Sequence, residues 1–392
     1  MSTADPTTVR PDSPELADSA ASAATAYVHV PFCARVCPYC DFAVVAGRDE
    51  LMGRYTRALA AEVGMARDWR PLDALYFGGG TPSRFGSQRL AGVVEAIRRR
   101  FQLAPGAEVT LEANPEDWTP QLAAELVAAG FTRVSFGAQS FSTPVLLALG
   151  RRHLPPDVIA AVTAARTEGF ASINLDLIFG TPGETIESWR ETVEAAIALE
   201  VDHVSCYALT VEKGTPLSRA VARGAPAPDP DLQADQYELA AELLAAAGYV
   251  RYEVSNWARP GHACLYNLAV WAQGEYEAFG NGAHGFRHGA RFRNIRRLDA
   301  YLQRVEEGEL PRAGEEPVSG WDAELDRMFV GLRRAAGVAD GPGVEAFLGS
   351  EEGRRLLELG VVEHARGRLR VTQPLLTDAV ERAVLSLTPR GP

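Results

Sequence analysis

Short apolar segments alternate with longer amphipathic segments through the first half of the chain. Alternation of strand-length and helix-length patterns is typical of βαβ units that build a parallel sheet. In the amphipathic stretch 184–200, for example, Ile186, Trp189 and Val193 recur close to a 3.6-residue period. The pattern predicts strands at 27–30, 74–77, 108–113, 133–138, 172–179 and 203–209, with helices at 51–66, 87–101, 120–129, 156–168 and 184–199.

Six such units predict an α/β fold, an incomplete (β/α)6 barrel over residues 26–225. Chemistry in such sheets gathers at the carboxyl ends of the strands. A Pro/Asp-rich stretch at 224–231 breaks the pattern, and a helix at 232–247 opens a barrel extension that we expect over 226–297.

From residue 298 the order of elements changes. We expect helices at 321–334, 343–348 and 352–359, strands at 361–365 and 368–372, and a last helix at 375–387. That order predicts a mainly helical, winged-helix-like C-terminal domain over 298–392.

The bulk properties narrow the class of protein. Residues 1–25 are polar, with neither a charged n-region nor an apolar h-segment, so we expect a disordered tail rather than a signal peptide. No run reaches the roughly 18 apolar residues of a membrane span. A net charge of −12 argues against a nucleic-acid partner. We expect a cytoplasmic protein.

Three cysteines, Cys33, Cys37 and Cys40, lie in one short loop with Cys-x3-Cys-x2-Cys spacing. A 4Fe-4S cluster takes one thiolate per iron, so three thiolates leave one iron open to a group that is not protein. Binding and reduction of S-adenosylmethionine (SAM) require that arrangement. A structural zinc site would need a fourth ligand, and no second Cys pair exists among the five cysteines of the chain. Cys206, in an apolar strand, is predicted to be a buried apolar residue.

Polar groups follow the ends of successive predicted strands. The run 78–80 is three glycines, which would let the backbone approach a ligand and expose its N–H and C=O groups. Glu112 and Gln139 end the next two strands, and Asp176 lies in an otherwise apolar strand. Since an unpaired buried carboxylate costs several kcal/mol, we expect Asp176 to bond to Arg151 or to a ligand. These groups predict one site at this edge of the sheet.

The cysteine run 32–40, Tyr76 to Ser83, Gly137 to Phe141 and Asn174 to Gly180 together resemble radical SAM proteins. More narrowly, they resemble the oxygen-independent coproporphyrinogen III oxidase group and its HemW-type heme-chaperone branch. The resemblance extends over about residues 26–385.

The resemblance implies a role for each matching residue. The three loop cysteines would hold the cluster, and its electron would cleave the sulfonium S–C bond of SAM. Tyr27 and Tyr39 would flank the methionine part of SAM. Gly79, Gly80 and Thr81 would bind its ammonium and carboxylate beside Glu112. Contacts to a second SAM or to nearby cofactor atoms would come from Gln139, Arg151, Asp176 and Ala208.

Two departures from the oxidases favour the chaperone branch. Phe42 occupies the position of a further cysteine in the oxidases, and a low-complexity tail replaces their longer N-terminal segment. A third departure argues against the chaperone branch. Those chaperones often show a His-Asn-x-x-Tyr-Trp motif, whereas the matching stretch of this chain, from Tyr266 to Trp271, begins with tyrosine. Tyr266 could ligate ferric heme as a phenolate. Further heme candidates are Trp271, His262, Cys264, His284 and His288, although these histidines and aromatics equally suit turns and core packing.

The implied function is that of a heme chaperone that carries a 4Fe-4S cluster, SAM and heme. Its implied partners are apo-hemoproteins of the respiratory chain, a low-potential electron donor such as a flavodoxin or ferredoxin, and a membrane surface contacted peripherally. Three alternatives stay open from the residues alone: an oxygen-independent coproporphyrinogen III dehydrogenase, another radical SAM enzyme such as a methyltransferase, and a zinc protein. The sequence leaves open whether the chain is an enzyme and which oligomer it forms.

Overall fold

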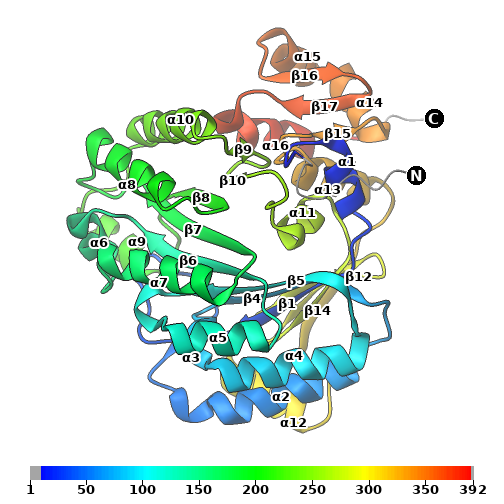
Figure 1. Cartoon of the computed structure of the whole chain (residues 1–392). Helices are drawn as coiled ribbons and strands as arrows, with labels where there is room; N and C mark the ends of the chain where they lie inside the picture. The colour runs from blue at the N-terminus through cyan, green and yellow to red at the C-terminus, as the bar shows by residue number, and fades with distance from the viewer. Residues whose placement is uncertain (1–9, 390–392) are drawn as a thin grey trace.

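Six strands that lie parallel to one another form the centre of the structure, a computed structural model that describes residues 10–389 (Figure 1). They pair in the order β1, β4, β5, β6, β7 and β8, as the alternating pattern predicts. Their bounds are β1 (Thr25–Val30), β4 (Leu72–Gly79), β5 (Leu103–Ala113), β6 (Arg133–Gln139), β7 (Ser172–Phe179) and β8 (His203–Ala208).

Later strands extend this sheet at both edges. Beside β1 lies β11 (Tyr276–Phe279), also parallel, followed by β12 (His284–Arg287), β13 (Ala290–Asn294) and β14 (Arg312–Pro317). Beside β8 lies β10 (Asn256–Ala258), which is antiparallel, and then β9 (Val250–Arg251). The 12-stranded sheet has two separate edges, so the barrel is incomplete, as expected.

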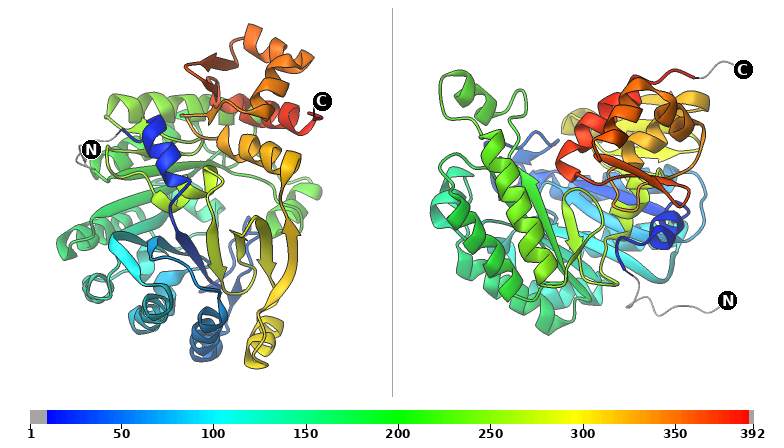
Figure 2. Two further views of the ribbon diagram at one scale, coloured as in Figure 1. Left: turned by 90° about the vertical axis from the view of Figure 1, so that its right-hand side faces the viewer. Right: turned by 90° about the horizontal axis from the view of Figure 1, so that it is seen from above.

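Amphipathic helices cover the outer face of the curved sheet, as the two views of Figure 2 show. Trp189 and Phe77 are among the fully buried side chains of the core between these layers. The covering helices are α2 (Met52–Met65), α4 (Ser87–Phe101), α5 (Pro120–Ala128), α7 (Pro155–Glu168), α8 (Ile186–Ala198), α10 (Pro230–Ala246) and α12 (Leu298–Glu306). Within residues 10–389, no helix combines the length and apolar character needed to traverse a bilayer.

The C-terminal region forms a second, smaller core around Met328, Phe347 and Leu369. Its three strands pair in the order β15-β17-β16. This strand order and the helix order confirm the winged-helix-like prediction. The elements are α13 (Gly320–Gly331), β15 (Val338–Ala339), α14 (Pro342–Gly349), α15 (Glu351–Glu358), β16 (Val362–Ala365), β17 (Arg368–Val371) and α16 (Thr377–Leu385).

The predicted disordered tail is wrong for residues 14–20, which form helix α1 (Pro14–Ala20). Ser13 caps this helix, and Ala17 is buried. Arg334 donates a 2.9 Å hydrogen bond to the Ala17 carbonyl, and Arg368 holds Asp18 through both carboxylate oxygens at 2.8 and 3.1 Å. Small alanines suffice to pack this helix, so low hydrophobicity did not reveal it. The first nine residues of the predicted tail lie outside the described residues.

A buried carboxylate fastens the edge strands and α12 to the barrel. Glu62, on α2, accepts hydrogen bonds from Tyr301 at 2.6 Å, from the side-chain amide of Asn294 at 2.6 Å and from the backbone N–H of Gly280 at 2.8 Å. Burial raises the pKa of Glu62 to about 7. The native state therefore holds a proton there at pH values where the unfolded chain has released it.

This difference predicts a pH dependence of stability. As the pH rises from about 4.5 to about 7, the native protein should lose stability relative to a Glu62→Gln variant, because the unfolded chain ionises Glu62 over this range while burial keeps the native carboxyl group protonated. At about 1.4 kcal/mol per pKa unit, the wild type should lose on the order of 3 kcal/mol of unfolding free energy relative to Glu62→Gln across this pH range. Denaturant unfolding at several pH values measures it. The exposed substitution Glu358→Gln is the control, and parallel pH profiles for the wild type and Glu62→Gln would contradict the assignment.

Candidate functional site

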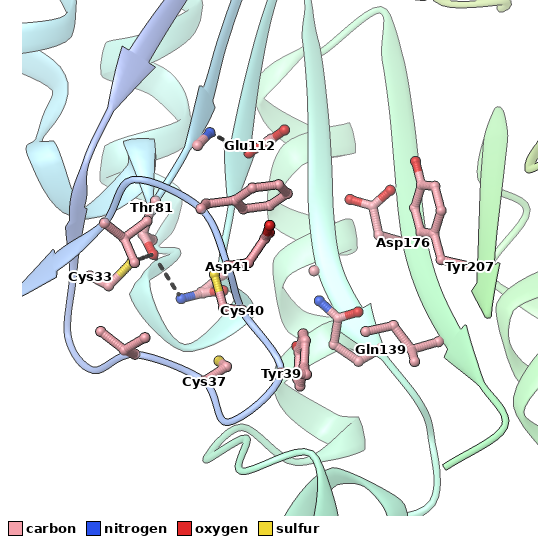
Figure 3. A pocket seen from close by; sticks show the side chains of 18 of the residues that line it. Cys33, Cys37, Tyr39, Cys40, Asp41, Thr81, Glu112, Gln139, Asp176 and Tyr207 are labelled. Atoms are coloured by element: carbon pink, nitrogen blue, oxygen red, sulfur yellow. Dashed lines mark hydrogen bonds between the residues drawn. The ribbon is translucent and has the colours of Figure 1, made fainter. Parts of the chain in front are cut away.

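The three loop cysteines and the carboxyl ends of the parallel strands enclose one cavity of about 450 Å³ (Figure 3). Cys33, Cys37 and Cys40 line one side, and Glu112, Gln139 and Asp176 line the other. The loop closes on itself because β2 (Phe32–Cys33) pairs with β3 (Val45–Ala46). The sequence-predicted groups at the strand ends thus share one site.

The thiols have polar neighbours but no preformed mononuclear metal site. Thr81 Oγ1 lies 3.6 Å from Cys33 Sγ, and Arg151 Nη1 lies 3.8 Å from Cys37 Sγ. Burial raises the pKa of Cys33 to about 11 and also raises the pKa of Cys40, so a metal must displace their protons when it binds. Within residues 10–389, no three His, Cys, Asp or Glu side chains converge on a single ion position.

This donor set fits a 4Fe-4S cluster. In such a cluster each thiolate binds a different iron, so the sulfur atoms need not surround one point. Three thiols on one wall of the cavity would hold three irons and would leave the fourth iron without a protein ligand. A structural zinc site needs four closed ligands, which this arrangement does not provide in the described residues.

The glycine run also serves close packing inside the protein, and the predicted free N–H groups are wrong for Gly79 and Gly80. A Cβ at Gly79 would lie 2.3 Å from the His29 ring, and one at Gly80 would lie 2.7 Å from the Val30 carbonyl oxygen. The N–H groups of both glycines are already bonded, to Glu112 and Val30 respectively. Both residues line the cavity beside Thr81, so the approach of their backbone to a ligand stays a prediction.

Glu112 is a buried carboxyl group held in position by two donors. The Tyr76 hydroxyl donates to one oxygen at 2.9 Å, and the Gly79 N–H donates to the other at 3.0 Å. Burial, together with the nearby carboxylate of Asp176, raises the pKa of Glu112 to about 7. An approaching cation would lower that pKa again, so this group suits a ligand ammonium.

Asp176 bonds to Ser135 on the neighbouring strand β6 and to Asn174 on its own strand, and the predicted bond to Arg151 is wrong. Ser135 donates to Asp176 at 2.6 Å and Asn174 at 2.9 Å, while burial raises the pKa of Asp176. Arg151 instead donates to Asn114 at 2.5 Å and to the Gly137 carbonyl at 3.0 Å. Its buried Nε has no hydrogen-bond partner among residues 10–389, so it could donate to a group bound in the cavity.

Most of the remaining predicted SAM contacts also line the cavity. Tyr39, Gln139 and Ala208 do so, whereas Tyr27 does not. The Tyr27 ring lies behind that of Tyr76, with 6.2 Å between ring centroids. The structure therefore puts Tyr76, rather than Tyr27, on the cavity wall.

Comparisons with known proteins agree with this geometry. The model of the radical SAM superfamily matches residues 27–196. "Heme chaperone HemW" of Mycobacterium tuberculosis (strain H37Rv) is 42% identical over 92% of this chain and 94% of its own length. The Bacillus subtilis protein of the same name is 32% identical over 89% of this chain and 95% of its own length. The chain belongs to the HemW family.

A solved structure shows how far the fold extends. Coproporphyrinogen III oxidase (HemN) of Escherichia coli, described as a radical SAM enzyme, superposes with a TM-score of 0.80 over 95% of this chain and 92% of its own. Its sequence is 22% identical, so it supports the fold of the HemW family member and not its activity. The radical SAM/HemN-like fold predicted from the motifs is confirmed.

A second cavity of about 320 Å³ adjoins the first, and it brings together two of the heme candidates of this HemW family member. Tyr266 and His284 line it, with Arg296 and Tyr27. Asp41 and Phe42 line both cavities, so the two are neighbours.

The other heme candidates lie elsewhere and have partners within the protein. His262 faces Asp202 at 3.8 Å, and the buried Cys264 thiol contacts Glu108 at 3.5 Å. The guanidinium of Arg333 lies over the Trp271 ring, 5.0 Å from its centroid. His288 occupies the turn between β12 and β13.

Polar residues of the first cavity that were not among the predicted site residues include Tyr76, Asn114, Ser135 and Tyr207. Ser135 precedes Gly137 and Gln139 at two-residue intervals, so strand alternation already put it on their face. Asn114 follows Glu112 at the end of β5 by the same rule. No comparable sequence signal distinguished Tyr207, which is accessible because it lies near the end of β8.

We predict that Cys37→Ala abolishes the cluster, because two remaining thiolates cannot hold three irons. Iron and acid-labile sulfide, measured after anaerobic reconstitution, should fall to background. Cys206→Ala is the matched control, since Cys206 is buried in β8, as predicted, and should leave iron and sulfide unchanged. Wild-type iron and sulfide in Cys37→Ala would exclude this ligand set.

Proposed function

We propose that this chain is a heme chaperone that binds a 4Fe-4S cluster, SAM and heme, and that it transfers heme to apo-hemoproteins. The observation that carries the proposal is the pairing of two neighbouring cavities, one with three thiols and one with Tyr266 and His284. Relatives named heme chaperones that match over nearly the whole chain support it.

The residues of the first cavity have separable tasks. When bound, the cluster would supply an open iron and an electron for SAM. Glu112 would hold the SAM ammonium, while Thr81 and the carbonyl groups of Gly79 and Gly80 would fix the methionine end. Gln139, Arg151, Asp176 and Ala208 would contact the rest of SAM or a second molecule, and Tyr39 would flank it.

The second cavity has the chemistry of a heme site. The stacked rings of Tyr266 and Tyr27, with 6.0 Å between their centroids, both line this cavity and would form an aromatic wall for a flat macrocycle. His284 offers an exposed imidazole, and Arg296 offers a cation for a propionate. Tyr266 or His284 would ligate the iron, while His262, Cys264 and Trp271, engaged elsewhere, would not.

The second candidate function is oxygen-independent dehydrogenation of coproporphyrinogen III, which the HemN-like fold favours. Phe42 argues against it. This residue, 62% exposed, puts an apolar ring between the two cavities where those oxidases carry a further cysteine.

We propose a heme carrier that acts in the cytoplasm. Its recipients would be respiratory apo-hemoproteins, and it would also contact a low-potential electron donor and, peripherally, a membrane.

Glu112 gives SAM binding a predicted pH dependence. Its carboxyl group binds an ammonium only when ionised, so the affinity of the wild type relative to Glu112→Gln should rise as the pH passes through about 7. At pH 8 we expect roughly a tenfold difference, the size of one charge-assisted hydrogen bond. Equilibrium binding of SAM to reconstituted protein at pH 6 and pH 8 measures it. Ionisation of SAM itself changes the affinity of both proteins equally. A ratio of wild-type to Glu112→Gln affinity that stays constant between pH 6 and pH 8 would therefore contradict the role of Glu112.

Heme binding is predicted to depend on Tyr266 or His284. Tyr266→Phe removes the phenolic oxygen and keeps the ring stacking, and His284→Ala removes the imidazole. One of the two should change the absorption spectrum of bound ferric heme, weaken binding about tenfold and slow transfer to an apo-hemoprotein. His262→Ala is the control.

The same preparation distinguishes the two candidate functions. Reconstituted protein with SAM and a low-potential reductant should leave coproporphyrinogen III unchanged. Formation of protoporphyrinogen IX would favour the dehydrogenase, and unchanged heme spectra in both variants would overturn the assigned heme cavity.

A further inference from the structure

A third cavity, of about 480 Å³, opens beside the cysteine loop between helix α6 (Thr143–Ala148) and the start of α7. Arg35 and Arg151 line both this cavity and the first one, so they form the wall between them. None of the residues assigned to the SAM methionine end lines the third cavity. It is therefore an approach to the cysteine loop that a bound SAM would leave open.

The distance from this surface to a cluster ligand is short. Arg151 Nη1 lies 3.8 Å from Cys37 Sγ, and its guanidinium group spans the wall. A protein seated over the third cavity would be separated from the Cys37 thiolate by about one side chain. A carrier protein that delivers one electron must come close to the cluster, but it does not have to contact the substrate.

The surface around this cavity combines unpaired cations with exposed apolar side chains. Among residues 10–389, neither Arg35 nor Arg152 has an acidic side chain within ion-pair distance, although the chain as a whole has a net charge of −12. Leu147 and Leu154, which line this cavity, are 68% and 48% exposed, and Val36, which is next to Arg35 and lines the first cavity, is 44% exposed. Apolar groups rimmed by charges mark interaction sites, and small interfaces of this kind are typical of electron-transfer encounters.

We propose that this surface, called here the donor face and made up of Arg35, Val36, Leu147, Arg152 and Leu154, docks a small acidic one-electron carrier protein. The proposal rests on the proposed function, because the electron is meant for the cluster. One electron leaves the reduced cofactor of the carrier and enters the cluster, and no bond forms or breaks in this step. Cationic Arg35 and Arg152 would steer the acidic carrier, and the leucines would form the dry centre of the contact.

A binding experiment tests the donor face directly. Oxidised flavodoxin is titrated into the reconstituted protein at low and at moderate salt, and heat or fluorescence is recorded. Arg152→Glu should weaken binding about tenfold and reduce its salt dependence, and Leu147→Ser should weaken it severalfold. Arg382→Glu, an exposed charge reversal on α16, is the matched control and should bind as the wild type does.

Reduction kinetics give a second readout. The cluster should be reduced about tenfold more slowly by reduced flavodoxin in Arg152→Glu, whereas dithionite, which needs no docking face, should reduce the wild type and the variant equally. SAM and heme affinities should not change, so loss of docking is distinguishable from failure of the proposed function. Wild-type binding and reduction rates in both variants would overturn the proposal, as would a wild-type protein that binds neither flavodoxin nor a bacterial ferredoxin at low salt.

Discussion

The cysteine loop depends on hydrogen bonds to its backbone that hold it against the ends of the strands. His29, buried in β1, contacts the Ala43 carbonyl through Nε2 at 3.0 Å and the Tyr27 hydroxyl through Nδ1 at 3.1 Å. Because a carbonyl can only accept, Nε2 carries the proton and Nδ1 accepts from Tyr27. Burial lowers the pKa of His29 to about 4, which keeps this neutral tautomer at physiological pH. Asn281 also donates to the Ala43 carbonyl, at 3.3 Å.

This clamp explains why distant parts of the chain serve one site. Asn281 lies just after β11, and Arg296, which donates to the Asp41 carbonyl, follows β13. The edge strands therefore hold the end of the loop from one side while β1 and β4 hold it from the other. The His29 ring also fills the space in which Gly79 lacks a Cβ, so the glycine run and the cysteine loop are positioned by the same side chain. A shift of either the glycine run or the cysteine loop would displace the thiols relative to Glu112.

The sequence predicted the parallel strands and their helices closely, because their period and apolar character are local properties. The bounds of α4 (Ser87–Phe101) and β7 (Ser172–Phe179) match the predictions at every residue. The strands β11 to β14 were not predicted, since short strands are specified largely by the neighbours they pair with. The cysteines and strand-end groups were found by spacing, whereas the contacts of Asp176 and the packing of the glycines depend on tertiary register. Helix α1 was missed for the same reason, as the C-terminal region supplies its partners.

The placement of Phe42 connects the two cavities and limits what each can do. Phe42 and Asp41 belong to the cysteine loop and line both cavities, so any shift of the loop on loading a cluster would also alter a wall of the proposed heme cavity. Tyr76 makes a second connection, because its hydroxyl holds Glu112 in the first cavity while its ring stacks on Tyr266 in the other. Two sites that share walls in this way can bind their ligands with mutual dependence, since each ligand favours one position of the common residues. Under the proposed function, the state of the cluster and SAM site would therefore bias how firmly a heme is held, with no contact between the ligands themselves.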